Sequence, residues 1–492
     1  MDVTQVTKLL EFFAWKVLWN PYFPIIFIIL GIYLTVGMRF FQFRRASDII
    51  YNTIGTLFRK KKKEKDSKGN LISSFGAFAT ALGGTVGTGN IAGVSSAIAI
   101  GGPGALFWMW IAALVGMATK MAEIILTQHY KQRYSDGSSY GSAAFYIEKG
   151  LVEERGWKWC KILAVVFTIF MIGSFYVAPG PYTIMESFQR SFDLSKYAAI
   201  GMSIAYTLLC YYIVLGGIPR VVKFAENVVP AMVLLYLAAG LYVIFQDLTA
   251  LRTAIASIFT YAFKPCAAIG GFAGVAVIKA VQIGVARSVY SNEAGWGSSA
   301  IIHATVDVDH PGRQGMWGAF EVGVDTLLIC TISGLMVIVT GAWKTGHGGA
   351  GAVGDALTAV FGPFGAYALS FFMLIFALTT TTGWFSYLES LIVYCTRNKT
   401  REQRIKYIQF VRFTGPGVPL LFTLYAFYNN MVPSVVWMLL DIQSAVPVYV
   451  NVVALTLLSP LIFRLTKEFE VGYLDPEKAA RKAARRAAAI AK

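Results

Sequence analysis

Long apolar stretches, separated by short polar loops, recur from one end of the chain to the other. About eleven of them reach the roughly 20 residues that a helix needs to cross the hydrocarbon core of a bilayer. They lie at residues 21–40, 73–100, 104–127, 162–183, 197–215, 227–247, 269–300, 316–341, 357–395, 407–427 and 432–460. The pattern predicts an all-α integral membrane protein with about 11 transmembrane helices.

The basic residues of the connecting loops predict the orientation of these helices. Cytoplasmic loops of membrane proteins are enriched in Lys and Arg. One alternation places the basic run from Arg59 to Lys68 and the cluster from Arg397 to Lys406 on the same side. The loops on the other side hold few basic residues, namely Arg190, Lys196, Arg252, Lys264 and Lys344. We therefore expect a multi-pass protein of the cell membrane with its N-terminus outside and its C-terminus in the cytoplasm.

Composition supports a membrane protein and argues against several other classes. Charged residues make up 14% of the chain and hydrophobic residues 56%, whereas a soluble domain has about 25% charged residues. The net charge of +16 is explained by cytoplasmic loops, so we expect the lipid bilayer and no nucleic acid as a partner. The five cysteines and four histidines are scattered singly. Their spacing predicts no disulfide framework, no zinc site and no catalytic site.

Two of the apolar stretches are interrupted by glycine. The stretch 73–100 contains ALGGTVGTGNIAG, Ala81 to Gly93, with five glycines, although glycine in a helix interior costs about 1 kcal/mol relative to alanine. The stretch 269–300 contains six, namely Gly270, Gly271, Gly274, Gly284, Gly295 and Gly297. The two stretches are five helices apart and enter the membrane from opposite sides. Such a pattern is typical of an inverted repeat of five plus five helices, in which each half opens with a broken helix.

The repeat predicts four parts of the chain. Residues 1–70 would hold an extra N-terminal transmembrane helix and a basic cytoplasmic loop, and residues 71–264 the first five-helix repeat. Residues 265–461 would form the second five-helix repeat, and residues 462–492 a cytoplasmic tail.

The glycines of the first stretch have two other interpretations. Gly87 to Ala92 fits the G-x-G-x-x-G/A fingerprint of dinucleotide-binding proteins. That fingerprint needs a preceding strand and an acidic residue about 20 positions later. Here the apolar residues FWMWIA, Phe107 to Ala112, follow instead, which argues against a nucleotide site. Close packing between helices, for which glycine leaves room, stays open as an alternative to a binding site.

A broken helix at Gly83–Asn90 would place unpaired backbone groups in the middle of the membrane. Such groups are tolerated only where they line a cavity or contact protein. The N–H groups at the start of a half-helix favour a carboxylate, and freed carbonyls suit a small hard cation. Thr85, Thr88 and Asn90 add side-chain oxygens at the same depth. Together these groups predict a site for a zwitterion and a sodium ion.

Other polar residues also lie at membrane depth, where charges are candidates for function. The threonine run from Thr379 to Thr382 predicts either a bent helix or a surface that faces an ion. Lys120 and Glu123 are expected to pair at the membrane interface, and Arg287 and Glu293 to serve packing or a cytoplasmic gate. Structural ion pairs and roles in ion coupling both stay open for three acidic residues, Glu321, Asp325 and Asp441.

Two stretches resemble a known transporter family. GGPGALFWMWIAALVG, Gly101 to Gly116, resembles the signature of the sodium:alanine symporter family, and SNEAGWGSSAIIHA, Ser291 to Ala304, is similar to a second stretch of that family. The family is similar in fold to the leucine-transporter (LeuT-like) superfamily. In that superfamily the first broken helix reads G-N-A-V-G-L-G-N, which Gly83 to Asn90 matches at five of eight positions.

The resemblance implies roles for residues of the first break. The amides around Thr88 and Gly89 would bind the substrate carboxylate, within a substrate site formed by Thr85, Gly87, Thr88, Gly89 and Asn90. One sodium ion would be held by the carbonyls of Gly83 and Val86 together with threonines of the ninth stretch, for which Thr379, Thr381 and Thr382 are the candidates. A second sodium site at Thr85 and Asn90 stays open.

The second broken helix offers no residue-by-residue match. From length alone we expect its break near Gln282–Gly284, because about ten residues would precede it from the outer surface. Gln282, Ile283 and Gly284 would then contact the substrate. Gly270–Gly274 is the other possible position of the break.

The sequence thus predicts a secondary active symporter that imports alanine, and also glycine, with sodium by alternating access. Thr88, in place of the leucine of the motif, indicates a smaller and more polar cavity. Sodium would be a co-transported ion, and no organic cofactor is expected. The alternatives are a proton-coupled carrier of another small amino acid and a channel. Oligomeric state is left open.

Overall fold

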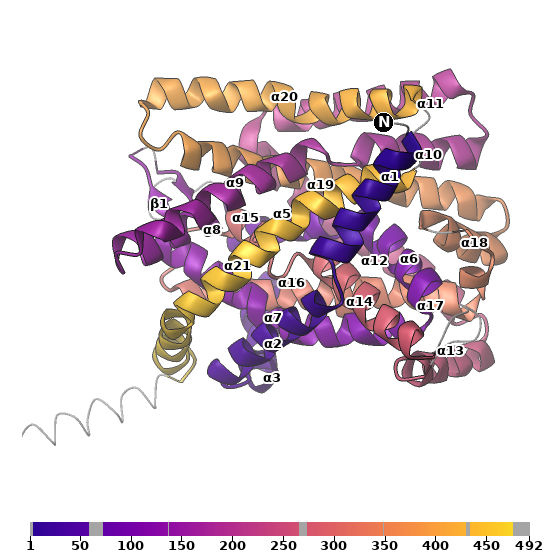
Figure 1. The fold of residues 1–492 in the computed structure, drawn as a ribbon, viewed down its shortest axis with the longest axis horizontal. Coiled ribbons are helices and arrows are strands. Elements are labelled where there is room, and N and C mark those ends of the chain that lie inside the picture. Colours follow the sequence, from indigo (N-terminus) through magenta and orange to yellow (C-terminus); the bar gives the residue numbers. More distant parts are fainter. Residues whose placement is uncertain are drawn as a thin grey trace, which may run out of the picture.

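The structure is a computed structural model that describes residues 3–58, 72–135, 137–264, 273–347, 349–429 and 433–475. It is a bundle of helices in which α20 follows one edge and α21 crosses obliquely in front of the others (Figure 1). The strands described, β1 (Gln132–Arg133) and β2 (Ser139–Tyr140), form one short antiparallel pair.

Nine helical stretches of the described residues are long and apolar enough to cross a membrane. They are Thr7–Gly37, Gly104–Tyr130, Lys158–Phe192, Lys196–Val214, Gly217–Ile244, Pro311–Val339, Phe364–Cys395, Arg401–Tyr428 and Met438–Leu474. Each overlaps one of the stretches predicted from the sequence. The two remaining predicted stretches, 73–100 and 269–300, are the glycine-rich ones. The predicted all-α membrane bundle is confirmed, with the two broken helices added to these nine stretches of the described residues.

The elements up to residue 264 begin with the N-terminal helices, which include the spanning stretch Thr7–Gly37. They are α1 (Val3–Glu11), η1 (Phe12–Leu18), α2 (Tyr22–Gly37), α3 (Phe41–Arg44), α4 (Ala46–Asn52) and η2 (Ile54–Phe58). The transmembrane helices and their connections follow: α5 (Ser74–Thr85), η3 (Gly89–Gly93), α6 (Val94–Gly101), α7 (Gly104–Tyr130), α8 (Ala143–Ile147), η4 (Glu148–Glu153), η5 (Lys158–Cys160), α9 (Lys161–Tyr176), α10 (Gly180–Phe192), α11 (Lys196–Val214), α12 (Gly217–Ile244) and α13 (Leu248–Tyr261).

The elements after residue 272 repeat this order of a broken helix followed by long ones. They are α14 (Ala273–Asn292), α15 (Ala300–His303), α16 (Pro311–Val322), η7 (Gly323–Cys330), α17 (Thr331–Val339), η8 (Ala342–Lys344), α18 (Ala350–Phe361), α19 (Phe364–Cys395), α20 (Arg401–Tyr428), α21 (Pro433–Phe469) and η9 (Glu470–Leu474).

The first glycine-rich stretch is broken where the sequence predicts it. α5 ends at Thr85, Val86 leaves the helical conformation with ψ 89°, and the chain turns again at Gly89 through the wide turn η3 into α6. A stretch of helix is thus replaced by an open backbone segment at the centre of the bundle. We call Val86–Asn90 the first break.

The second break does not lie near Gln282–Gly284, so that prediction is wrong. α14 runs without interruption from Ala273 to Asn292, and the chain opens at Glu293–Ser299 before α15. The alternative position, Gly270–Gly274, lies largely outside the described residues. Gly295 and Gly297 have φ of 86° and 77°, a conformation that glycine adopts at no steric cost. We call Glu293–Ser299 the second break.

Two predicted stretches are divided by loops. The stretch 162–183 spans α9 and the start of α10, which are separated around Pro179. The stretch 357–395 begins in the short helix α18, and its membrane-spanning part is α19, which starts at Phe364. In both cases proline and glycine at the junctions end one helix and begin the next.

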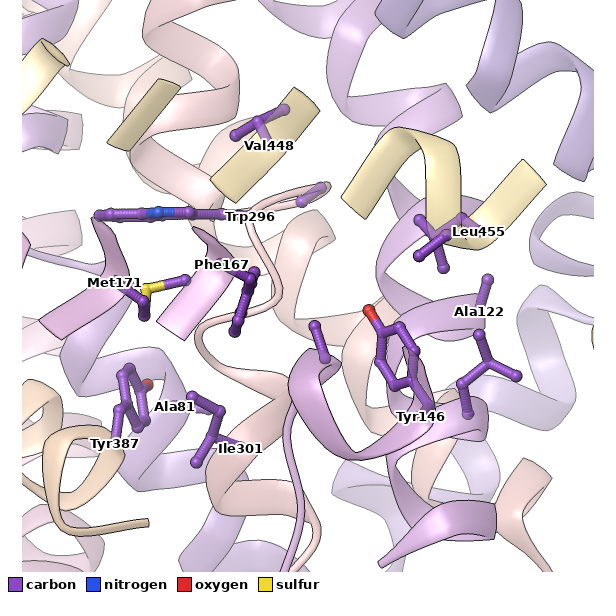
Figure 2. Close-up of a cluster of buried hydrophobic side chains, with 14 of the residues drawn as sticks. Ala81, Ala122, Tyr146, Phe167, Met171, Trp296, Ile301, Tyr387, Val448 and Leu455 are labelled. Carbon is purple, nitrogen blue, oxygen red and sulfur yellow. The ribbon is translucent and has the colours of Figure 1, made fainter. Parts of the chain in front are cut away.

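The largest cluster of buried apolar side chains encloses the second break. Figure 2 shows Trp296, from the break itself, among side chains of α5, α7, α9, α19 and α21. Trp296 is 1% exposed and Tyr387, on α19, is fully buried. The two breaks are therefore surrounded by tightly packed helices, and any polar group that they expose must find a partner inside the protein.

Candidate functional site

The side chain of Asn90 forms hydrogen bonds that hold the first break in place. The N–H of Val86 donates to the Leu82 carbonyl at 2.7 Å and so ends α5. The N–H of Gly87, the next residue, donates to Oδ1 of Asn90 at 2.8 Å. The side-chain Nδ2 of Asn90 donates to Oδ1 of Asp325 at 2.6 Å. Asn90 is fully buried. Its amide therefore links the backbone of the break to Asp325 of η7.

Asp325 connects the two broken helices to each other. Its Oδ2 accepts hydrogen bonds from Ser291 on α14, at 2.9 Å, and from Thr326, at 2.8 Å. The carboxylate is fully buried, and the donors of these hydrogen bonds are neutral side chains. Glu321, one turn earlier, bonds Lys120 and His303 instead. Glu321 and Asp325, whose roles the sequence left open, therefore belong to different clusters of polar side chains.

The threonine run of α19 presents only part of its hydroxyls to the first break. Thr380 donates to the Gly83 carbonyl at 3.2 Å, and Thr379 packs 3.2 Å from the place where a Gly83 side chain would begin. Thr381 lies about 200° around the helix from Thr379 and bonds Tyr206 of α11 at 2.6 Å. Thr381 thus bonds away from Gly83, whereas Thr380, which the prediction left out, contacts the Gly83 carbonyl.

Two other predicted residues bond carbonyls of their own helices. Thr382 bonds the Leu378 carbonyl of its own helix at 2.8 Å, and Thr85 bonds that of Leu82 at 3.2 Å. Thr88 is 7% exposed, the most exposed polar side chain of the break. The ring of Tyr290, on α14, lies 3.0 Å from the position of a Gly89 side chain. Space beside the first break is therefore narrow.

A cavity of about 1020 Å³ lies next to the first break. Gly93 and Tyr290 line it on the side of the break, and Trp15 of η1 lines it on the side of the N-terminus. The residues of the first break are themselves buried and do not line the cavity. The cavity therefore leads toward the break, and Tyr290 lies between the two.

The three residues predicted to line the second break point in different directions. Only Ile283 lines the cavity. Nε2 of Gln282 donates to the Trp19 carbonyl at 2.5 Å, and Gly284 packs so closely against Ala105 of α7 that a side chain there would lie 2.5 Å from the Ala105 carbonyl. Gly284 thus allows close approach of two helices, whereas the break needs the glycines with positive φ. Gln282 and Gly284 do not contact the cavity.

An ion pair lies at the wall of the cavity. Arg287 of α14 donates to both oxygens of Asp441 on α21, at 3.0 and 3.3 Å. The Trp15 ring lies 5.1 Å from the guanidinium carbon, and the Trp19 indole donates to the Asp441 backbone carbonyl at 2.8 Å. Arg287 thus pairs with Asp441 and not with Glu293. The pair joins the N-terminal segment, α14 and α21.

Thr183 lies in the cavity wall and was not predicted from the sequence as a site residue. Thr183 of α10 lines the cavity, its side chain is 5% exposed, and its hydroxyl has no hydrogen-bond partner among the described residues. A buried hydroxyl without a partner at the wall of a cavity is suited to a polar ligand. The only signal in the sequence is its position just after the two prolines at the junction of α9 and α10.

Charged residues contact the second break and do not line the cavity. Nζ of Lys120, on α7, lies 3.3 Å from Oε1 of Glu321 on α16 and also bonds the Ser299 hydroxyl. Glu293 accepts hydrogen bonds from the indole of Trp384, at 2.8 Å, and from the Ser298 hydroxyl.

Lys120 and Glu123 are fully buried, and Lys120 pairs with Glu321 and not with Glu123, so the predicted Lys120–Glu123 pair is wrong. α7 packs against α8, α15 and α16.

A model of the sodium:alanine symporter family matches residues 3–483 of the chain. The chain belongs to the sodium:alanine symporter family. The chain is 34% identical over 477 residues to an uncharacterized transporter of Haemophilus influenzae, covering 95% of this chain and 96% of the relative. It is 32% identical over 476 residues to the sodium/alanine symporter AgcS of Methanococcus maripaludis, with 95% and 98% covered. It is 31% identical over 468 residues to the probable sodium/glutamine symporter GlnT of Bacillus subtilis, with 94% and 91% covered.

Solved structures identify the fold of this family member. The structure of MhsT in complex with L-phenylalanine has a TM-score of 0.50 at 16% identity, with 80% of this chain and 98% of that chain covered. The substrate-bound structure of a Na⁺-coupled sialic acid symporter has a TM-score of 0.52 at 12% identity, with 88% and 97% covered. The predicted LeuT-like fold is confirmed. The chain is a multi-pass membrane transporter of amino acids and not an enzyme.

The first break generates a stability prediction. Asn90→Ala would leave the Gly87 N–H and one oxygen of Asp325 without partners inside the bundle. A buried unsatisfied group costs about 1–3 kcal/mol, so we expect a lower melting temperature for the purified variant without ligands. The matched control is Asn227→Ala, whose exposed amide bonds only a carbonyl of its own helix. Equal melting temperatures for both variants would contradict the role given to Asn90.

Proposed function

We propose that this transporter imports a small neutral amino acid, alanine and also glycine, together with sodium. The observation that carries the proposal is the meeting of the first break with the threonine face of α19. There the carbonyl of Gly83 and the hydroxyl of Thr380 lie 3.2 Å apart. Carbonyl and hydroxyl oxygens that converge in this way match the preference of small hard cations.

The sodium ligands in this proposal are the carbonyls of Gly83 and Val86 and the hydroxyls of Thr379 and Thr380. Thr382 remains a candidate through its position one turn from Thr379. Thr381 is replaced by Thr380, because its hydroxyl bonds Tyr206 on the opposite face of the helix. These ligands carry no net charge. They would therefore bind the ion weakly enough for it to be released after transport.

The amino acid would bind beside the ion, between the first break and Tyr290. The N–H groups at Thr88 and Gly89 begin the helical segment that continues into α6, and a helix N-terminus favours a carboxylate. Thr85 and Gly87 complete the wall, while Asn90 positions the break. The Tyr290 ring lies 3.0 Å from the position of a Gly89 side chain, and this close approach favours a small amino acid as the substrate. The choice of alanine and glycine as substrates is part of the proposal, because similar relatives are named as symporters of glutamine and of alanine.

Alternating access supplies the mechanism. With the N-terminus outside, the cavity faces the exterior and the charged residues around the second break close the cytoplasmic side. Sodium and the amino acid together would stabilise the occluded form, because each ligand adds contacts that bind both halves of the fold. The two repeats, 71–264 and 265–461, would then move relative to each other and open the cytoplasmic side.

Uptake into proteoliposomes tests the proposal. Labelled alanine is supplied outside vesicles that carry an inward sodium gradient, an inward proton gradient or neither. Accumulation above equilibrium is expected with the sodium gradient, and unlabelled alanine inside should accelerate entry of the label, as in a carrier. Uptake that ignores both gradients would contradict symport. Uptake driven by the proton gradient alone would favour the proton-coupled alternative.

Two threonine variants test the ion ligands. Thr380→Val removes a hydroxyl ligand, and a hydrogen bond or similar contact to a charged group contributes about 1.5–3 kcal/mol. The sodium concentration for half-maximal uptake should therefore rise about tenfold or more. Thr381→Val, the neighbouring control, should leave that concentration unchanged. A stronger effect of Thr381→Val would restore Thr381 as a ligand and refute the assignment of Thr380.

A further inference from the structure

The N-terminal segment Val3–Trp19 forms one wall of the cavity beside the first break. It consists of α1, η1 and the residue after η1, and it packs against α21 (Figure 1). Six of its residues line the cavity at helical spacing, namely Thr7, Lys8, Glu11, Phe12, Trp15 and Lys16. The three charged residues described in the segment are all among them. A stretch that is long and apolar enough to span a membrane thus directs its charges to the cavity.

The segment is separated from α2 by an interruption of the helix. Trp19 leaves the helical conformation with ψ 41°. Oδ1 of Asn20 then accepts hydrogen bonds from the N–H groups of Tyr22, at 2.8 Å, and Phe23, at 3.2 Å. These bonds satisfy N–H groups that the start of α2 leaves free. Because α2 begins anew here, the segment can move with the helices that it contacts while α2 keeps its place.

Trp15 joins the segment to helices that are far apart in the sequence. Its ring packs against a cluster of buried apolar side chains that includes Ile98 of α6 and Ile283 of α14. It also packs against a second cluster that includes Val435 and Met438 of α21. α6 continues from the first break and α14 leads into the second. A movement of either break therefore reaches the segment through this one side chain.

The same ring covers the ion pair at the cavity wall. The guanidinium carbon of Arg287 lies 5.1 Å from the ring centre of Trp15 and 5.8 Å from that of Tyr290, within the range of a cation–π interaction. Its two terminal nitrogens donate to Asp441. A side chain at Gly93 would begin 3.7 Å from Cδ of Arg287. Trp15 thus covers one face of a charged group that stands directly after the first break.

Hydrogen bonds fasten the end of the segment to the same two helices. Nε2 of Gln282, on α14, donates to the Trp19 carbonyl at 2.5 Å and to the Trp15 carbonyl at 3.4 Å. The Trp19 indole donates to the Asp441 backbone carbonyl of α21 at 2.8 Å. Gln282, which the sequence assigned to the substrate, therefore holds the segment in place.

We propose that the N-terminal segment is a movable cover of the transport cavity, and that Trp15 is the positioning residue that fastens it to the Arg287–Asp441 pair. The cover and the ion pair release together. When α14 moves away from α21, Arg287 leaves Asp441 and its guanidinium leaves the Trp15 ring. That the cover lies on the outside of the cell rests on the proposed function. Its attachment does not.

Cysteine labelling of the purified protein in detergent tests the attachment without any transport. Ser96→Cys places a thiol on the cavity wall, and its rate of reaction with a charged thiol reagent reports access to the cavity. In this background, Trp15→Leu keeps an apolar side chain but offers no ring to Arg287. The rate should rise about three- to tenfold, the factor that a cation–π contact contributes to an equilibrium. Trp15→Phe keeps a ring over the guanidinium and should leave the rate near its original value.

The matched control is Val17→Ala, because Val17 is an exposed residue of the same helix η1 that does not line the cavity. This variant should leave the labelling rate unchanged. Equal increases with Trp15→Leu and Trp15→Phe would refute the role of Trp15, since packing alone would explain them. Gln282→Met removes the donor to the Trp19 carbonyl and should also raise the rate. An unchanged rate in both Trp15→Leu and Gln282→Met would overturn the cover itself.

Labelling of intact cells tests on which side the cover lies. A membrane-impermeant thiol reagent added outside should react with the thiol of Ser96→Cys, and faster when Trp15→Leu is also present. Labelling that occurs in detergent but not from outside the cells would refute the outer position and leave the attachment standing. If no ion gradient drives uptake, the proposed function fails, and the detergent experiment still decides whether the segment covers the cavity.

Discussion

An open backbone inside a membrane must satisfy its own polar groups, and this constraint organises the whole structure. Each of the two breaks frees several N–H and C=O groups where no bulk water reaches them. At the first break Asn90 supplies an amide to Gly87 and passes its own hydrogen bond to Asp325. At the second break Asn451 bonds the Gly295 carbonyl while binding Glu123. An asparagine thus ties each break to a buried carboxylate on a neighbouring helix.

The two breaks differ in what they leave for ligands. The first has narrow space beside Tyr290 and carbonyls next to the threonines of α19, and the buried carboxylate of Asp325 bonds it through Asn90. These properties suit ligands that must bind and leave. The second is packed around Trp296 and enclosed by charged side chains that bond one another. It is therefore suited to hold one side of the transporter closed until several interactions change together, which is a cooperative switch and not an open site.

Much of the fold could be predicted from the sequence, because apolar length and basic loops are sufficient to find spanning helices. The first break could be predicted because glycine recurs there beside polar side chains. The second was misplaced because glycine has two uses in that stretch: Gly284 allows close helix contact, whereas Gly295 and Gly297 adopt positive φ. The choice among the threonines and the partner of Lys120 depended on helix rotation and on packing between distant segments. A single sequence contains neither.

The most direct test of the account is mutual dependence of the two ligands at equilibrium. Alanine binding to the purified transporter is measured over a series of sodium concentrations, and sodium binding over a series of alanine concentrations. If both ligands occupy the first break, sodium raises the affinity for alanine, and alanine raises the affinity for sodium by the same factor. Alanine binding with an affinity independent of sodium would contradict the account.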